Sequence, residues 1–362
     1  MSVATSTPEA WATLSLKALP HTALVALLRA FGDPHAVLAA TRAALCAVVP
    51  ATIAARVQAP PDADALATTR GWLADPTHEI IAWDDPDYPR ALLDLGYAPP
   101  ALFFVGRREL LNRPALAIVG SRNASAQGAA NARAFAHALA QSGLTVVSGL
   151  AVGVDAAAHD GALAGEGSTL AVVGTGLDRV YPAANRDLAH RIAEHGGLLS
   201  EFPPGTPPRE KNFPRRNRLI SGLSRGVLVV EAALSSGSLI TARYAGEQGR
   251  EVFAIPGSIH SPLSKGCHKL IREGAKLVET ARDILEELGM GGSAMGVART
   301  QTIMASPVEA TLLAALGGDP ATMDLLVERT GLASDVVMAT LIRLELDGQV
   351  ASLPGALWQR LG

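Results

Sequence analysis

The sequence predicts an α/β fold: an extended, Rossmann-like, mostly parallel sheet, preceded by a small helical domain and followed by a winged-helix domain. Three observations predict it. Short apolar runs alternate with helix-length segments over residues 76–288, glycine and hydroxyl residues follow several of these runs, and apolar spacing is helical on either side. The 362 residues are 48% hydrophobic and 18% charged, with a formal net charge of -3, which is typical of a folded protein of two or three domains.

Residues 1–75 form the expected helical domain, because alanine and leucine recur there at helical spacing. Residues 16–32 have the outline of a degenerate helix-hairpin-helix or SAM-like unit, but His21 and Thr22 stand where hairpin glycines would present their amides. Five bases balance five acids in this segment. We therefore expect packing or oligomer contacts here rather than strong DNA binding.

Residues 76–288 form the expected Rossmann-like domain. Strands that are apolar on both faces and separated by helices indicate a parallel sheet covered on both sides. Ligands bind such sheets beyond the carboxyl ends of the strands. The nine expected strands are Glu79–Trp83, Ala101–Val105, Ala115–Val119, Thr145–Ser148, Thr169–Val173, Leu198–Ser200, Val227–Glu231, Val252–Ile255 and Lys276–Val278.

Small and hydroxyl residues follow these strands, where free backbone N–H groups and a helix start favour an anion. One such turn is weak evidence, because glycine after a strand is commonly only a tight connection. Several turns in one sheet predict a row of phosphate-binding turns. The turn residues that we expect to bind phosphate are Gly120, Ser121, Arg122, Ser148, Gly149, Gly174, Thr175 and Gly176. The same pattern occurs in two further turns of the row, Ser200–Phe202 and Ser235–Leu239.

A cationic run, residues 209–218, adds five Lys or Arg against one acid, about +4 in a chain of net negative charge. Guanidinium groups suit phosphate oxygens, and Phe213 can stack on an unpaired base. We expect these groups to share one face of the fold with the glycine turns. The alternative is a scaffold in which Arg216 and Arg218 pair with Glu201 or Glu231.

The sequence contains little that indicates a nucleotide-hydrolysing, serine-hydrolase, dinucleotide-binding or metal site. The P-loop and serine-hydrolase elbow patterns are absent, and the glycines at 174–176 lack the third glycine of a dinucleotide fingerprint. Cys46 and Cys267 lie far apart without a ligand set, so we expect no metal, no cofactor and a reducing cytoplasm. No signal peptide is apparent. The uncharged stretch 134–154 contains glycines and serines, and it predicts a helix end, a turn and a strand rather than a membrane span.

With these motifs assembled, the chain resembles the DNA-processing protein A family, also called Smf, over residues 78–288. The resemblance rests on Val119–Arg122, Ser148–Asp155 with His159, Gly174–Asp178, Leu199–Phe202, Phe213–Gly222, Ser236–Ala242, Gly249–Gly257 and Gly266–Ala275. It implies a dimeric, non-enzymatic protein that binds single-stranded DNA. It further implies loading of the RecA recombinase onto strands covered by single-strand-binding protein, in natural transformation and recombination.

Carried over by position, the resemblance makes Arg122 a phosphate clamp, Phe213 the base-contacting ring and Arg216 a second backbone contact. It adds Lys211, Arg215 and Asn217 to the expected DNA site. The partner and dimer surface is expected around Leu270, Ile271 and Arg272.

An alternative from another class is a phosphoribohydrolase, a nucleotide-cleaving enzyme that has a related Rossmann-like sheet. Glu231, which precedes Ser236–Thr241, would be the glutamate that assists its reaction. That enzyme needs a compact pocket for one phosphate, whereas cations beside Phe213 suit a strand that crosses the surface. We therefore expect no catalytic residues.

Beyond the sheet, residues 289–303 are expected to be a flexible linker. Residues 304–362 predict helices at 307–316, 322–330 and 334–347 and a strand pair near 350–358, the order of a winged helix. This segment contains three arginines and seven acidic residues, and its net charge of about -4 would repel a phosphate backbone. We interpret this domain as a protein-interaction or regulatory module.

Overall fold

The computed structural model describes residues 7–290, 306–317, 320–353 and 355–361. The expected linker 289–303 lies outside the described residues, apart from Gly289 and Met290. In the described part, no helix combines the length and apolar character that crossing a bilayer requires. The uncharged stretch 134–154 is the end of one helix, a turn, a strand and the start of the next helix, as predicted.

The central feature is a nine-stranded sheet in the order β1-β2-β6-β5-β4-β3-β7-β8-β9. Its strands are β1 (His78–Ala82), β2 (Ala101–Gly106), β3 (Ala115–Val119), β4 (Thr145–Ser148), β5 (Thr169–Val172), β6 (Gly197–Ser200), β7 (Gly226–Val229), β8 (Glu251–Ala254) and β9 (Lys276–Leu277). The β1–β2 and β2–β6 pairs are antiparallel and the other pairs are parallel. The predicted Rossmann-like fold is thereby confirmed, with all nine expected strands within two residues of their predicted ends.

Strand order reverses between β3 and β7. From β3 the chain steps through β4, β5 and β6 to one side, and it returns to β7 on the other side of β3. The connections that leave β3 and β7 therefore diverge, which opens a crevice at the carboxyl ends of these two strands.

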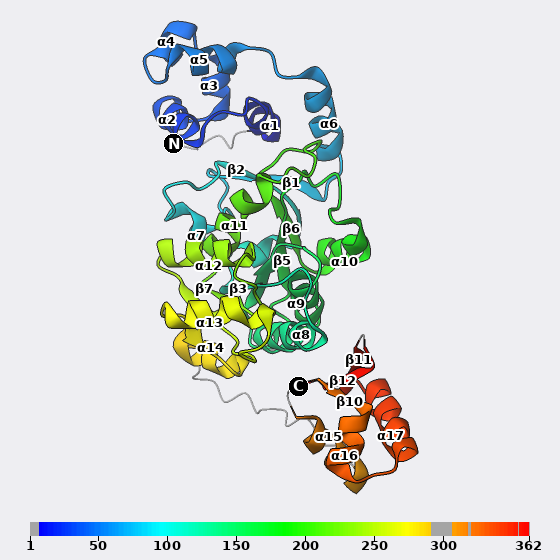
Figure 1. The fold of residues 1–362 in the computed structure, drawn as a ribbon. Helices are drawn as coiled ribbons and strands as arrows, with labels where there is room; N and C mark the ends of the chain where they lie inside the picture. Colours follow the sequence, from blue (N-terminus) through cyan, green and yellow to red (C-terminus); the bar gives the residue numbers. More distant parts are fainter. Residues whose placement is uncertain (1–6, 291–305, 318–319, 354, 362) are drawn as a thin grey trace.

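Helices cover both faces of the sheet (Figure 1). Adjacent residues of β3 point to opposite sides: Leu116 and Ile118 join the core under α8, α9 and α14, whereas Ala117 and Val119 join the core under α7, α11 and α12. This burial on both faces is why the strands contain few polar residues. The helices are α7 (Arg90–Leu93), α8 (Ala126–Gln141), α9 (Val154–Ala162), α10 (Arg186–His195), α11 (Asn212–Gly222), α12 (Ser238–Glu247), α13 (Lys265–Arg272) and α14 (Ala281–Glu287). Within the described residues, short 3-10 helices span Arg108–Asn112, Ala183–Asn185 and Pro262–Ser264.

The N-terminal helices pack on the β1–β2 end of the sheet (Figure 1). They are α1 (Pro8–Leu16), α2 (His21–Phe31), α3 (Pro34–Ala39), α4 (Arg42–Cys46), α5 (Ala51–Gln58) and α6 (Ala63–Leu73). Phe103 of β2 is fully buried in their core, with its ring 5.8 Å from that of Trp72 in an edge-on arrangement. This contact joins the helical segment to the sheet.

The C-terminal segment is a winged helix, as predicted. It consists of α15 (Pro307–Leu316), β10 (Ala321–Thr322), α16 (Met323–Thr330), α17 (Ser334–Leu346), β11 (Val350–Leu353) and β12 (Leu357–Arg360). Its sheet has the order β10-β12-β11, and it has its own core around Leu326, Leu341 and Trp358.

Replacing Phe103 tests the join between the helical segment and the sheet. We expect Phe103→Ala to lower the free energy of unfolding by about 3–5 kcal/mol, because it leaves a cavity under packed helices. Leu93→Ala is the control, since Leu93 is 52% exposed and its loss is expected to stay within about 0.5 kcal/mol. Urea unfolding of both variants measures this, and equal losses would contradict the proposed packing role.

Candidate nucleic-acid interface

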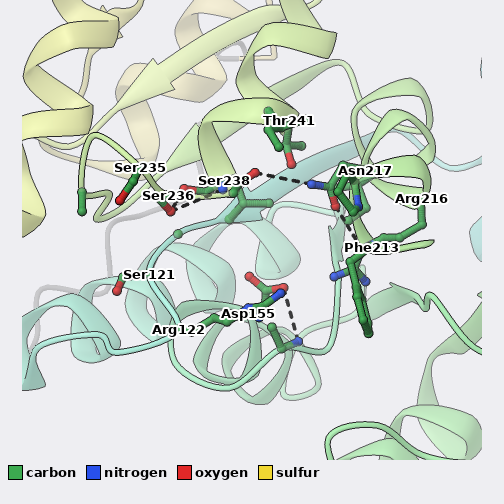
Figure 2. Close-up of a pocket in the computed structure, with 18 of the residues that line it drawn as sticks. Ser121, Arg122, Asp155, Phe213, Arg216, Asn217, Ser235, Ser236, Ser238 and Thr241 are labelled. Carbon is green, nitrogen blue, oxygen red and sulfur yellow. Dashed lines mark hydrogen bonds between the residues drawn. The ribbon is translucent and has the colours of Figure 1, made fainter. Parts of the chain in front are cut away.

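A groove of about 590 Å³ lies at the strand-order reversal, where residues that follow β3 and β7 meet α11 and the start of α12 (Figure 2). Side chains from five separate segments converge on it. The polar and aromatic groups that line it are Ser121, Arg122, Asp155, Tyr181, Glu210, Phe213, Arg216, Asn217, Ser235, Ser236, Ser238 and Thr241, with Gly120 and Gly237 among its backbone walls.

An aromatic and cationic ladder forms one side of the groove. The Phe213 ring is half-buried, with the Arg122 guanidinium carbon 5.9 Å from its centroid and the Tyr181 ring centroid 5.5 Å away. Arg122 is exposed, and none of the ion pairs among the described residues involves it. The ladder therefore offers a π-face and a positive charge that no carboxylate neutralises. The structure brings together Arg122 and Phe213, which lie far apart in sequence, as the sequence analysis expected.

Hydroxyl groups at the start of α12 form the opposite side (Figure 2). Ser236 Oγ and Ser238 Oγ lie 2.7 Å apart, and Asn217 Nδ2 donates to the Gly237 carbonyl at 3.4 Å, which ties α11 to this turn. These serines belong to the turn after β7, which the sequence predicted as one of the phosphate-binding turns, although they were not named among the residues of the DNA site. Thr241 and Tyr181 were not predicted to line the site.

Arg216 forms the floor of the groove rather than part of its surface. It is only 5% exposed, and its guanidinium donates to the carbonyl oxygens of Gly149 and Val172. A Cβ atom on Gly149 would lie 2.3 Å from that guanidinium, so any other residue there would require the Arg216 side chain to move. Burial lowers the pKa of Arg216 to about 10, against the opposing influence of Asp155, and the side chain stays charged at neutral pH. Its expected contact with the DNA backbone stays a prediction.

The turn after β4 does not offer its amides to a ligand. Asp155 Oδ2 accepts from the N–H groups of Gly149 at 3.1 Å and Ala151 at 3.3 Å, and His159 Nε2 accepts from Leu150 N–H at 3.3 Å. A carboxylate and an imidazole of the protein therefore occupy the place expected for a phosphate. Burial raises the pKa of Asp155, while Arg216 and the two N–H groups oppose that shift.

The remaining turn residues are also enclosed. Ser148 Oγ donates to the Ile118 carbonyl at 2.6 Å, and the Gly174 carbonyl accepts from Asn212 Nδ2 at 3.0 Å. Thr175 is 1% exposed, and Gly176 is buried. The expectation is thus wrong for the turn after β4, where Asp155 and His159 accept from the backbone N–H groups. In the turn after β5, the Gly176 N–H donates to the Thr206 carbonyl at 3.0 Å. Phosphate binding at the turns after β3 and β7 stays a prediction.

The cationic run does not share a single face, contrary to expectation. Lys211, Arg215 and Arg218 point to the other side of α11, away from the groove. Arg215 and Arg218 each donate to Glu201 Oε2, at 2.8 and 2.6 Å, and the Glu201 side chain is 2% exposed. The scaffold alternative is therefore confirmed for Arg218, which pairs with Glu201. It is wrong for Arg216, whose guanidinium donates to backbone carbonyls and forms no ion pair with Glu201 or Glu231 in the described structure. Contacts of Lys211 and Arg215 with DNA stay predictions.

Glu231, the glutamate of the phosphoribohydrolase alternative, accepts hydrogen bonds from the N-cap residue of α8. Its two oxygens accept from the Ser125 hydroxyl and from Ser125 N–H at 2.9 Å, just ahead of α8. It is not among the groups that line the groove.

Leu270, Ile271 and Arg272 lie on α13, away from the groove. The two apolar side chains are half-buried against the sheet core and Arg272 is exposed, and their role as a partner or dimer surface stays a prediction. Within the described ranges, no group of three His, Cys, Asp or Glu residues is arranged to hold a metal ion.

The chain matches two family profiles: residues 79–289 match "DNA recombination-mediator protein A", and residues 298–356 match "DprA winged helix domain". It is 45% identical to Protein Smf of Escherichia coli over 291 residues, 78% of each chain. The structure of DNA processing protein A from Streptococcus pneumoniae is similar, with a TM-score of 0.69 at 40% identity over 78% of this chain and 98% of that one. That of DNA processing protein A from Helicobacter pylori, described for its single-stranded DNA binding mode, gives a TM-score of 0.54 at 30% identity over 58% of this chain and 95% of that one.

The buried His159 predicts a pH dependence of stability. Burial, reinforced by Arg216, lowers the pKa of His159 from 6.5 to about 3. The unfolded chain therefore binds the proton more tightly, and stability falls as pH decreases below 6.5. Between pH 7 and 5 this group is expected to cost about 2 kcal/mol. Urea unfolding of the wild type and His159→Gln at both values measures it. Asp155 is present in both proteins, and its raised pKa changes stability with pH in the opposite direction, so the difference between the two proteins reports His159 alone. If both proteins lose the same free energy of unfolding between pH 7 and 5, His159 does not cause the pH dependence.

The two arginines on Glu201 are expected to differ in stability. The Arg218 side chain is 12% exposed and also donates to the Tyr97 carbonyl at 2.9 Å, whereas the Arg215 side chain is 58% exposed. Arg218→Ala leaves a buried carboxylate with one partner fewer and is expected to cost about 3 kcal/mol. Arg215→Ala is expected to cost less than about 1 kcal/mol. Thermal unfolding compares them, and equal losses would show that burial does not set the strength of these pairs.

Proposed function

Because this chain belongs to the DNA recombination-mediator protein A family, also named DprA or Smf, we propose that its groove binds single-stranded DNA. The observation that carries the proposal is the stack of Arg122 and Phe213, with the guanidinium carbon 5.9 Å from the ring centroid. This stack presents a charge for phosphate beside a ring face for a base. The Helicobacter pylori relative, described for its single-stranded DNA binding mode, supports the same substrate class.

An unpaired base is the ligand that suits Phe213. The ring is half-buried at the groove edge beside the exposed Tyr181, so one base can stack there. Every base has a π-face, so such stacking tolerates any sequence and contributes about 1–3 kcal/mol per base. Because the bases of a duplex already stack on their neighbours and cannot reach the Phe213 ring, the groove is expected to prefer single strands.

The phosphate path crosses the groove from Arg122 to the start of α12. Arg122 supplies the charge, and the hydroxyls of Ser235, Ser236 and Ser238 supply donors beside the positive end of a helix. With a formal net charge of -3 on the whole chain, attraction to DNA is confined to this groove rather than spread over the molecule.

The wider role that we propose is that of a cytoplasmic, dimeric mediator that brings the RecA recombinase to strands otherwise covered by single-strand-binding protein. It acts without catalysis, and the engagement of Glu231 with Ser125 outside the groove supports that part. The domain boundaries near residues 75 and 288 separate the DNA-binding sheet from modules for protein contacts. The acidic winged helix is proposed to contact proteins rather than DNA.

Two groove variants test the proposal by different signatures. Arg122→Ala is expected to weaken oligo-dT binding and to reduce the slope of log affinity against log salt by about 0.7, the value for one phosphate contact on a single strand. Phe213→Ala is expected to lose about 1–3 kcal/mol of binding with the slope unchanged. Fluorescence anisotropy at several salt concentrations measures both quantities.

The matched control is Arg225→Ala, because Arg225 is exposed and precedes β7 at the amino edge of the sheet. Circular dichroism confirms that each variant is folded. If Arg122→Ala binds like the control, Arg122 does not belong to the site. Incubation of the wild type with nucleoside monophosphates tests the absence of catalysis, and steady release of free base would favour the phosphoribohydrolase.

A further inference from the structure

The outer face of α17, the last helix of the winged helix, is apolar and exposed. Nine large apolar side chains are exposed among the described residues, and four of them lie on this helix: Val336, Met338, Ile342 and Leu346. Met338, Ile342 and Leu346 are four residues apart, so they lie on one side of the helix and form the α17 stripe. Leu341, on the other side, is buried in the core of the domain. The core of the winged helix therefore forms without the stripe.

The charges around the α17 stripe do not suit DNA. Arg343 is the one base in the sequence of α17, and it pairs with Glu309 of α15 at 2.5 Å. Asp335 and Asp347, at the two ends of the helix, are exposed. A phosphate backbone is attracted by free Lys or Arg, whereas this face offers hydrocarbon between two carboxylates. The partner that fits it is an apolar surface with positive charge around it.

The sheet domain carries such a surface between α12 and α13. A groove of about 730 Å³ lies there, the α12–α13 groove, and its apolar lining includes Leu234, Leu239, Ile240, Val252 and Leu270. Leu234 is 62% exposed. Residues 243–276, which form much of the border, contain six Lys or Arg and three acids, a net charge of +3 in a chain of net charge -3. None of the described residues of the winged helix lines this groove, so both apolar surfaces are open (Figure 1).

We propose that the winged helix docks in the α12–α13 groove of its own chain, with the α17 stripe against Leu234 and Leu270. Each surface could instead pair with its like in a second copy. That pairing brings together two winged helices of net charge about -4, or two segments of net charge +3, and like charges repel. Docking of the winged helix in the groove brings opposite charges together and covers both apolar surfaces.

The length of chain between the two domains allows this contact within one molecule. The 15 residues 291–305 separate the described part of the sheet domain from that of the winged helix, and a chain of that length spans at most about 50 Å. A surface tethered in this way acts at an effective concentration of about millimolar. That exceeds the concentration of a second copy in a micromolar solution, so docking within one chain is favoured over exchange between two copies.

Docking brings negative charge to the edge of the candidate nucleic-acid interface. Ser235, Ser236 and Gly237 line both that interface and the α12–α13 groove. A domain of net charge about -4 beside this turn repels phosphates that approach it. The docked form is therefore expected to bind DNA more weakly than the open form. This consequence, unlike the docking itself, rests on the proposed function.

An engineered disulfide tests the docking in the full-length protein. Cys46→Ser removes the exposed native cysteine, and Leu234→Cys with Leu346→Cys places one thiol in the groove and one on the stripe. Under mild oxidation we expect a disulfide within the monomer, with a yield that does not depend on protein concentration. The control carries Leu346→Cys alone and keeps Cys46, which lies on α4, and it is expected to react at least about ten-fold more slowly. A disulfide only between chains, or one that forms no faster than in the control, would overturn the proposal.

A charge on the stripe tests the contact itself. Ile342→Lys, added to the protein with the two new thiols, places a cation against a positive groove and is expected to slow disulfide formation about ten-fold. Ala310→Lys is the control, because Ala310 is exposed on α15 and the added charge is the same. Circular dichroism confirms that both variants are folded. Equal rates for the two variants would contradict docking through α17.

Oligo-dT binding by the disulfide-locked protein tests the consequence for DNA. We expect its affinity to rise at least about three-fold when the same protein is reduced, and this gain to shrink as salt is added. The wild type, treated with the same reductant, is expected to show no change. An unchanged affinity of the locked protein would overturn the regulation of DNA binding. If neither form binds oligo-dT, the proposed function fails, whereas the disulfide result needs no DNA and still decides the docking.

Discussion

The buried guanidinium of Arg216 is the interaction on which the site depends. A charge 95% removed from solvent is tolerated only when its donors are satisfied and an opposite charge is near. Arg216 meets this condition with the carbonyls of Gly149 and Val172 and with the electrostatic influence of Asp155. These partners follow or end strands β4 and β5, so the side chain holds α11 against the carboxyl edge of the sheet.

Because α11 is fixed in this way, the positions of its neighbouring side chains are also fixed. Phe213 stands nearly one turn before Arg216 and is therefore held at the rim of the groove, with its ring against Gly174. Asn217 follows Arg216 and ties the helix to the Gly237 carbonyl on the far side. The opposite face of the same helix holds the buried Glu201 through Arg215 and Arg218. The two faces of one helix thus have different chemistry.

The sequence was sufficient for the fold, because each strand is apolar on both faces and glycine or hydroxyl residues mark its carboxyl end. It also predicted that Arg122 and Phe213 share one face, because one follows a strand and the other begins a helix, and their contacts with DNA stay predictions. It failed for the cationic run, since consecutive residues of a helix turn by about 100° each and cannot all face one way. It also failed for the β4 turn, where Asp155 and His159 take the amides. Which donors a folded chain satisfies internally depends on contacts between segments that no local pattern contains.

We propose that an unpaired base stacks on Phe213 in the groove between β3 and β7. Replacing Phe213 with tryptophan turns that ring into a reporter, and subtracting the wild-type signal removes the contribution of the four native tryptophans. Titration with oligo-dT is predicted to quench the added fluorescence with the same midpoint as DNA binding measured by anisotropy. Full binding with no change at the new tryptophan would contradict the account.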